Sequence, residues 1–223
     1  MTAIRFETAD RLSLEGELRQ PEGTTRGAAV LCHPLPEGGG SKDHPLLWAI
    51  RNDLAGNRGL VVLGFNYRGV MGSEGTRSGR VSGSGVDELK DVAAAVARVR
   101  EEADGPLVLI GWSFGANVAL RYTVESGGVA ALALIGIPLN GSAPSLPDLP
   151  TRDYLRDFAA PVLLVVGEAD PFSPVPGVRS LARRIPSADV LVLPDTDHFF
   201  RGREREVAEA IGGFVDGVLG QDG

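Results

Sequence analysis

The chain has 223 residues, a formal net charge of −7 at pH 7, and 43% hydrophobic and 23% charged residues. This composition is ordinary for a water-soluble globular protein. The length suits one domain with a sizeable core, so we expect residues 1–223 to form a single domain. The acidic balance argues against nucleic acid and anionic membranes as partners, because both require a basic face.

The cysteine content and the N-terminal sequence indicate the compartment in which the protein is expected to function. Cys32 is the sole cysteine, which excludes an intramolecular disulfide and fits a reducing compartment. The N-terminus has neither the basic region nor the apolar core of a signal peptide. No apolar stretch approaches the roughly 18 residues that a membrane span needs. We therefore expect a cytoplasmic protein without a membrane partner.

The strand signals come in two kinds. Residues 4–8 and 12–19 alternate between polar and apolar side chains and are predicted to be strands joined by a turn at 9–11. Later apolar runs predict strands that are buried on both faces, as in a parallel sheet. These runs are residues 27–33, 60–67, 106–112, 129–137, 161–168 and 188–195.

Helical patterns lie between most of these runs, at residues 44–57, 86–102, 114–126, 177–185 and 203–219. The order predicts an α/β fold: a mostly parallel sheet with helices on both faces and an antiparallel edge formed by the N-terminal strands. The segment 138–161 is rich in Pro, Ser and Asp. We expect a connection within the domain, with a short helix at 151–158, too short to form a large lid.

The sequence Gly111-Trp112-Ser113-Phe114-Gly115 fits the pattern G-x-S-x-G between an apolar strand and a helix. A sharp turn from strand to helix strains the serine backbone and projects its hydroxyl outward, beside the free N–H groups of the helix. The two glycines allow the close packing that such a turn needs. The pattern indicates a nucleophilic serine; the alternative is an ordinary serine in a tight turn.

A serine hydroxyl becomes a good nucleophile only when a base takes its proton. The chain has three histidines, His33, His44 and His198, and only His198 follows the serine. It lies in a polar loop between the last predicted strand and the last predicted helix. We expect His198 to be the base, the alternative being a histidine of a surface loop.

The base in turn needs an acid that orients its ring. Asp170 lies just past a predicted strand, and the order Ser113, Asp170, His198 is the one expected for an α/β-hydrolase. Glu168 is closer to the strand and is the main rival. Asp195 and Asp197 lie too near His198 in sequence to face its ring easily.

The loop after the third predicted strand offers a donor for an oxyanion hole. Pro34 and Pro36 have no N–H, whereas Leu35 between them does, and the prolines restrict its backbone. The N–H of Phe114, next to the serine, is the expected second donor. His33 is expected to hold this loop by hydrogen bonding, although it could be mistaken for a catalytic residue.

The motifs HPLPEGGG, FNYRGVMGSEG, GWSFGA, GEADPFSP and DHFFRG together resemble the small, lidless α/β-hydrolases, over about residues 28–205. The resemblance implies a carboxylesterase-like serine hydrolase and supports the roles of Ser113, Asp170 and His198. The chain departs from the family pattern at Leu35, where a histidine is usual, and at Trp112, where phenylalanine is usual. Met71 replaces a typical glycine. These departures bear on substrate preference.

Two further features of the sequence concern ion pairs and metal ligands. Arg68 opens a glycine-rich loop and is expected to form a structural ion pair with an acid such as Asp87 or Glu88, the alternative being contact with an acidic substrate group. One cysteine and three scattered histidines show no metal-ligand spacing, so we expect no metal and no cofactor.

The sequence thus predicts a serine hydrolase that cleaves small or short-acyl carboxylic esters through an acyl-enzyme. Ser113 attacks, His198 transfers the proton, Asp170 orients His198, and the Leu35 and Phe114 N–H groups bind the oxyanion. A thioesterase would use the same residues. A non-catalytic ligand-binding protein on the same fold is the alternative from another class.

Overall fold

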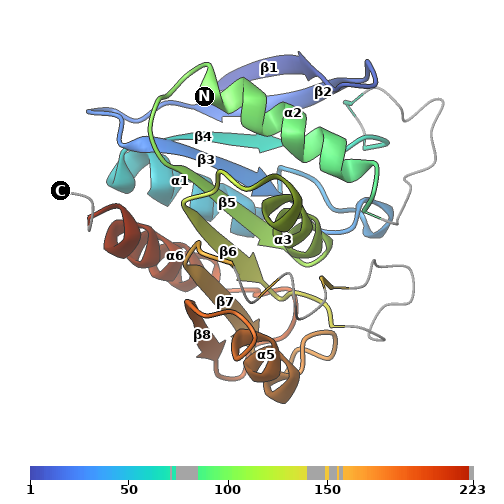
Figure 1. The fold of residues 1–223 in the computed structure, drawn as a ribbon, viewed down its shortest axis with the longest axis vertical. Helices are drawn as coiled ribbons and strands as arrows, with labels where there is room; N and C mark the ends of the chain where they lie inside the picture. Colours follow the sequence, from blue (N-terminus) through green and yellow to red (C-terminus); the bar gives the residue numbers. More distant parts are fainter. Residues whose placement is uncertain (71, 74–84, 140–148, 151–154, 156–157, 221–223) are drawn as a thin grey trace.

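The computed structural model describes residues 1–70, 72–73, 85–139, 149–150, 155 and 158–220. Its strands form one eight-stranded sheet in the order β1-β2-β4-β3-β5-β6-β7-β8 (Figure 1). The strands are Thr2–Glu7 (β1), Ser13–Arg19 (β2), Gly27–Cys32 (β3), Leu60–Phe65 (β4), Leu107–Trp112 (β5), Ala131–Ile135 (β6), Val162–Gly167 (β7) and Ala188–Leu193 (β8).

The strand directions confirm the predicted sheet. β1 pairs antiparallel with β2, and β2 pairs antiparallel with β4, so the N-terminal pair forms an antiparallel edge. The pairs from β4 through to β8 are all parallel. The short helix expected at 151–158 lies largely outside the described residues.

Helices cover both faces of the sheet, as expected. They are Pro45–Arg58 (α1), Glu88–Arg100 (α2), Phe114–Ser126 (α3), Val175–Ala182 (α5) and Glu204–Leu219 (α6), with a 3₁₀ turn at Pro36–Gly38 (η1). Residues of α2, α3 and α5 belong to one buried cluster, and residues of α1 and α6 belong to the other. The sheet is therefore the middle layer of three.

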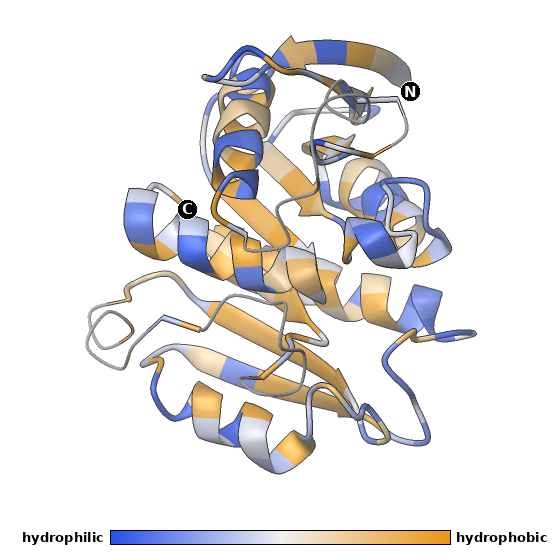
Figure 2. Ribbon diagram, turned by 90° about the vertical axis from the view of Figure 1, so that its right-hand side faces the viewer, coloured by the Kyte–Doolittle hydropathy of each residue, from blue (hydrophilic) through white to orange (hydrophobic). Residues whose placement is uncertain are grey.

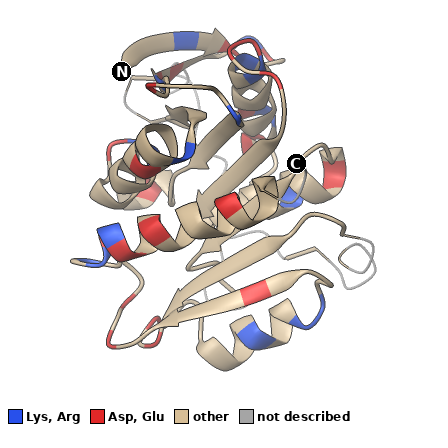
Figure 3. Cartoon of the chain, turned by 90° about the vertical axis from the view of Figure 1, so that its left-hand side faces the viewer, with Lys and Arg blue, Asp and Glu red and all other residues tan. Residues whose placement is uncertain are grey.

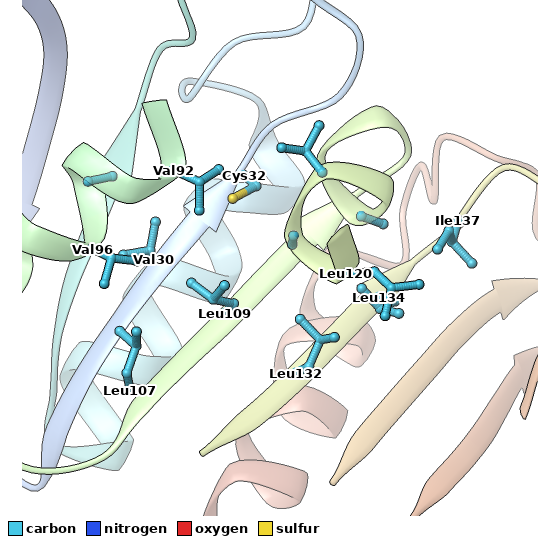
Figure 4. Close-up of a cluster of buried hydrophobic side chains, with 14 of the residues drawn as sticks. Val30, Cys32, Val92, Val96, Leu107, Leu109, Leu120, Leu132, Leu134 and Ile137 are labelled. Atoms are coloured by element: carbon cyan, nitrogen blue, oxygen red, sulfur yellow. The ribbon is translucent and has the colours of Figure 1, made fainter. Parts of the chain in front are cut away.

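The inner strands are apolar on both sides because successive side chains of a strand point to opposite faces. In β3, Ala28, Val30 and Cys32 join the cluster under α2 and α3, while Ala29 and Leu31 join the cluster under α1 and α6. Figure 4 shows part of the first cluster between the strands and these helices. The strands are largely hydrophobic in Figure 2, and the charged residues lie mainly on helices and loops in Figure 3.

This topology fixes where a site can form. The carboxyl ends of parallel strands meet at one edge of the sheet, which is where ligands bind in open α/β folds. Ser113 follows β5, Asp170 lies just past β7, and His198 lies just past β8. Three residues far apart in the sequence are thereby brought to the same edge.

Arg68 forms ion pairs, but with different acids from those expected. Its guanidinium Nε donates to Asp91 Oδ1 over 2.9 Å, and its Nη1 donates to Asp10 Oδ2 over 2.8 Å. The backbone N–H of Arg68 also donates to Asp91 Oδ2 over 2.9 Å. The partners are therefore Asp91, one turn beyond Glu88 on α2, and Asp10 in the first turn. Arg68 ties the N-terminal edge to α2.

Replacing Arg68 by methionine should destabilise the fold by about 3 kcal/mol or more, because Asp91 is fully buried and would lose its cationic partner. Urea unfolding measures the change. Lys90→Met is the matched control, since exposed Lys90 also pairs with Asp10 and should matter far less. Equal losses in the two variants would show that the Arg68 network does not stabilise this edge.

Candidate active site

Ser113 lies at the turn between β5 and α3, in a strained backbone conformation. Its φ is 56° and its ψ is −119°, a region that residues with a side chain rarely adopt. Its N–H donates to the carbonyl of Ile135 on β6 over 2.8 Å, which ties the turn to the neighbouring strand. The predicted strand, sharp turn and helix are all present.

The glycines on either side of the serine are required by close backbone contacts. A Cβ at Gly111 would clash with the carbonyl oxygen of Gly115, and a Cβ at Gly115 would clash with the carbonyl oxygen of Cys32. The start of α3 therefore lies directly against the end of β3. Larger residues at either position would push the serine away from its place at the sheet edge.

The structure brings Ser113, His198 and Asp170 into one hydrogen-bonded chain. His198 Nε2 lies 2.9 Å from Ser113 Oγ, and His198 Nδ1 lies 2.7 Å from Asp170 Oδ2. All three residues are buried, with 8% or less of their surface exposed. Asp170 Oδ1 accepts the backbone N–H groups of Phe172 and Ser173, which fixes the carboxylate plane.

The rival acids lie elsewhere. Glu168 is exposed, and its Oε2 accepts the backbone N–H of Asp195 over 3.4 Å. Asp197 is also exposed, and its Oδ1 accepts the N–H of Phe199. Asp170 is the acid that contacts the His198 ring among the described residues.

The expected oxyanion donors lie on two adjoining segments. Phe114 is the first residue of α3, and its N–H has no partner within the helix. The Leu35 carbonyl accepts the N–H groups of Gly38 and Gly40, each over 3.0 Å, so the loop around η1 folds back on itself. Neither the Leu35 nor the Phe114 N–H donates to another described residue.

His33 holds this loop in place through hydrogen bonds. It is not part of the hydrogen-bonded series formed by Ser113, His198 and Asp170. Its Nδ1 bonds the carbonyl of Pro34 over 2.6 Å, and its Nε2 accepts the backbone N–H of Tyr67 over 3.0 Å. Complete burial lowers the pKa of His33 to about 4, so its ring is neutral at neutral pH. A neutral ring can donate at one nitrogen and accept at the other, as these two contacts require.

A cavity of about 400 Å³ opens above the serine. It is lined mainly by apolar atoms, and the residues are Pro34, Leu35, Gly38, Gly39, Gly40, His44, Trp112, Ser113, Pro138, Phe172, His198, Phe199 and Arg201. Phe172 and Phe199 are 37% and 46% exposed, so the cavity is open to water on this side.

Trp112 has a larger part in the site than its sequence position indicated. Phe114 packs beneath the turn in the core, whereas Trp112 lines the cavity. Its indole N–H donates to the carbonyl of His198 over 3.2 Å, and its ring centre lies 4.3 Å from that of His44, with the two ring planes tilted by 57°. Trp112 therefore links the serine turn to the loop that carries His198.

Gly136 is a second residue that sequence reasoning missed. Its φ is +50°, and a Cβ there would lie 3.2 Å from both Asp170 Oδ2 and the His198 ring. A side chain at this position would crowd the contact between acid and base. A glycine after an apolar strand is too common to have been noticed in the sequence alone.

The described residues hold neither a group of metal-binding side chains nor a membrane-spanning helix. No group of three or more His, Cys, Asp or Glu residues is arranged to hold a metal ion in that part of the chain. Among the described helices, none has the length and apolarity needed to cross a bilayer.

Known proteins are similar to this one over most of its length. Residues 27–211 match a family described as an alpha/beta hydrolase domain. A structure from Xanthomonas campestris, described as an a/b serine hydrolase without lid, is 26% identical and has a TM-score of 0.78. The alignment covers 95% of this chain and 92% of that one.

Two other solved structures are similar. An alpha-beta serine hydrolase homologue from Coxiella burnetii is 25% identical, with a TM-score of 0.80, over 95% of this chain and 96% of that one. An esterase from Pyrococcus furiosus shares the fold at 19% identity, with a TM-score of 0.79, over 98% of this chain and 92% of that one. No curated protein matches the sequence.

The resemblance to small lidless α/β-hydrolases, first read from the motifs, is thus confirmed by the family match and by these neighbours. The match spans most of the sheet, from β3 to α6. The chain belongs to the α/β-hydrolase family.

Proposed function

We propose that the protein is a serine hydrolase that cleaves small carboxylic esters through an acyl-enzyme intermediate. The observation that carries this proposal is the buried chain from Asp170 through His198 to the strained Ser113, at the floor of an open cavity. The solved relatives add support, since two of them are described as serine hydrolases.

In the first half-reaction, Ser113 Oγ attacks the ester carbonyl while His198 Nε2 takes the hydroxyl proton. Asp170 orients the ring through Nδ1 and stabilises the positive charge that forms on it. The carbonyl oxygen becomes negative and is bound by the N–H groups of Leu35 and Phe114. The protonated His198 then gives its proton to the leaving alcohol, which departs and leaves the acyl group on Ser113.

In the second half-reaction, water replaces the alcohol. His198 takes a proton from the water, and the resulting hydroxide attacks the acyl carbonyl. The second tetrahedral intermediate uses the same two N–H donors. It collapses with release of the carboxylic acid, and His198 returns the proton to Ser113 Oγ.

The cavity supports a small substrate. Its volume is near the lower end of the range for ligand pockets, about 300–1,000 Å³. Because the cavity is open on the side of Phe172 and Phe199, extra methylenes of a long acyl chain would stay partly solvated and gain less than the roughly 0.8 kcal/mol each of full burial. We therefore assign short-acyl esters, with thioesters of the same acids as chemically equivalent substrates.

Replacing Ser113 by alanine should lower kcat for p-nitrophenyl acetate by a factor on the order of 10⁴–10⁶, because no nucleophile remains to form the acyl-enzyme. Steady-state kinetics measure the loss, with the circular dichroism spectrum as the control for folding. A folded variant with a tenth of the original activity would rule out Ser113 as the nucleophile. Wild-type protein inactive on all short esters would favour the non-catalytic alternative.

Exchanging the acids tests the orientation of His198. Asp170→Asn should reduce kcat by about 10⁴, because the ring loses its charged partner and its correct tautomer. Glu168→Gln removes an equivalent charge only two residues away, on an exposed side chain, and should have a far smaller effect. If Glu168→Gln were the more damaging change, the proposed acid would be wrong.

A further inference from the structure

One permanent charge lies in the wall of the proposed substrate cavity. Arg201 follows the loop that carries His198 and precedes α6. Among the described residues that line the cavity, it is the sole side chain with a fixed charge, and none of them is acidic. The remaining wall is mostly apolar, and Arg201 itself is exposed.

The pairing of Arg201 differs from that of the arginines that follow it. Arg203 pairs with Glu206 at 3.0 Å, and Arg205 pairs with Glu209 at 2.7 Å. Arg201 forms no ion pair with a described acid. Its guanidinium carbon lies 5.2 Å from the centre of the Phe199 ring, in a cation–π contact. The ring supports the guanidinium and leaves its N–H donors without a described carboxylate.

His44 adds a neutral polar group to the same cavity. Its Nδ1 accepts the backbone N–H of Leu46 over 3.2 Å, at the start of α1. Burial lowers the pKa of His44; Glu204 opposes this shift and the charge of Arg201 adds to it. The ring is therefore neutral at neutral pH, and because Nδ1 is an acceptor, the remaining proton is on Nε2, as a donor.

We propose that the site selects esters that carry a carboxylate, which Arg201 binds while Ser113 attacks the ester carbonyl. The inference rests on the proposed ester hydrolysis and extends it to a substrate class. A planar guanidinium can hold a carboxylate through two parallel hydrogen bonds, which orients the substrate as well as attracting it. The protein as a whole is acidic, so this preference has to come from the local charge in the cavity wall.

Two pairs of probes test the preference and locate the anion. p-Nitrophenyl hemisuccinate and p-nitrophenyl pentanoate differ in a carboxylate on the acyl side. 4-Carboxyphenyl acetate and 4-methylphenyl acetate differ in a carboxylate on the leaving-group side. For each pair, the measured quantity is the ratio of kcat/KM for the anionic ester to kcat/KM for the neutral ester.

The variants are Arg201→Met, which keeps an unbranched apolar side chain but removes the guanidinium, Arg201→Lys, which keeps a positive charge, and Arg205→Met as the matched control on α6. Arg201→Met should lower the ratio about fivefold in at least one pair, mainly through KM, as expected for an exposed ion pair. Arg201→Lys should recover part of the loss, and Arg205→Met should leave the ratio unchanged. The affected pair identifies the half of the ester that carries the carboxylate.

An unchanged ratio in both pairs with Arg201→Met would overturn the proposal. So would an equal loss on anionic and neutral esters, because this would indicate a structural role for Arg201. A loss of the same size with Arg205→Met would also contradict it, because it would show a general effect of net charge. Failure of the wild-type protein to hydrolyse any of the four esters would instead contradict the proposed function itself, and with it this inference.

Discussion

The site depends on one backbone constraint, the sharp turn that takes the chain from β5 into α3. Ser113 has positive φ there, and close backbone contacts on both sides hold the turn in this strained conformation. Gly111 contacts Gly115, and Gly115 contacts the end of β3 at Cys32. The turn thus places the serine hydroxyl and the first N–H of α3 beside the loop of Leu35.

The remaining parts of the site are held to this turn by similar close approaches. A Cβ at Gly167 would clash with the carbonyl of Thr196, so the end of β7 lies against the loop that carries His198. Gly136 leaves space for the contact between Asp170 and His198, and the Trp112 indole bonds the His198 carbonyl. The geometry of the site therefore depends on main-chain packing at the carboxyl edge of the sheet.

The sequence was sufficient for the fold and for the residues that the fold brings together. Apolar runs mark strands buried on both faces, and the G-x-S-x-G pattern marks a turn whose consequences are local. The sequence did not predict the contacts between segments that are distant along the chain. Asp10 and Asp91 as partners of Arg68 depend on how segments far apart in the chain come together, and so does the place of Arg201 in one cavity wall with Leu35 and His44. The spacing of residues in the sequence does not predict such long-range contacts.

We propose that the buried hydrogen-bonded series of Asp170, His198 and Ser113 makes the serine a nucleophile. Labelling with a fluorophosphonate measures this directly, because the reagent reacts with serines activated by a base. Intact mass followed by peptide mapping should give one adduct per chain, at Ser113, and His198→Ala should abolish it while the fold is retained. Absence of an adduct in the wild-type protein, or an adduct at another residue, would contradict the account.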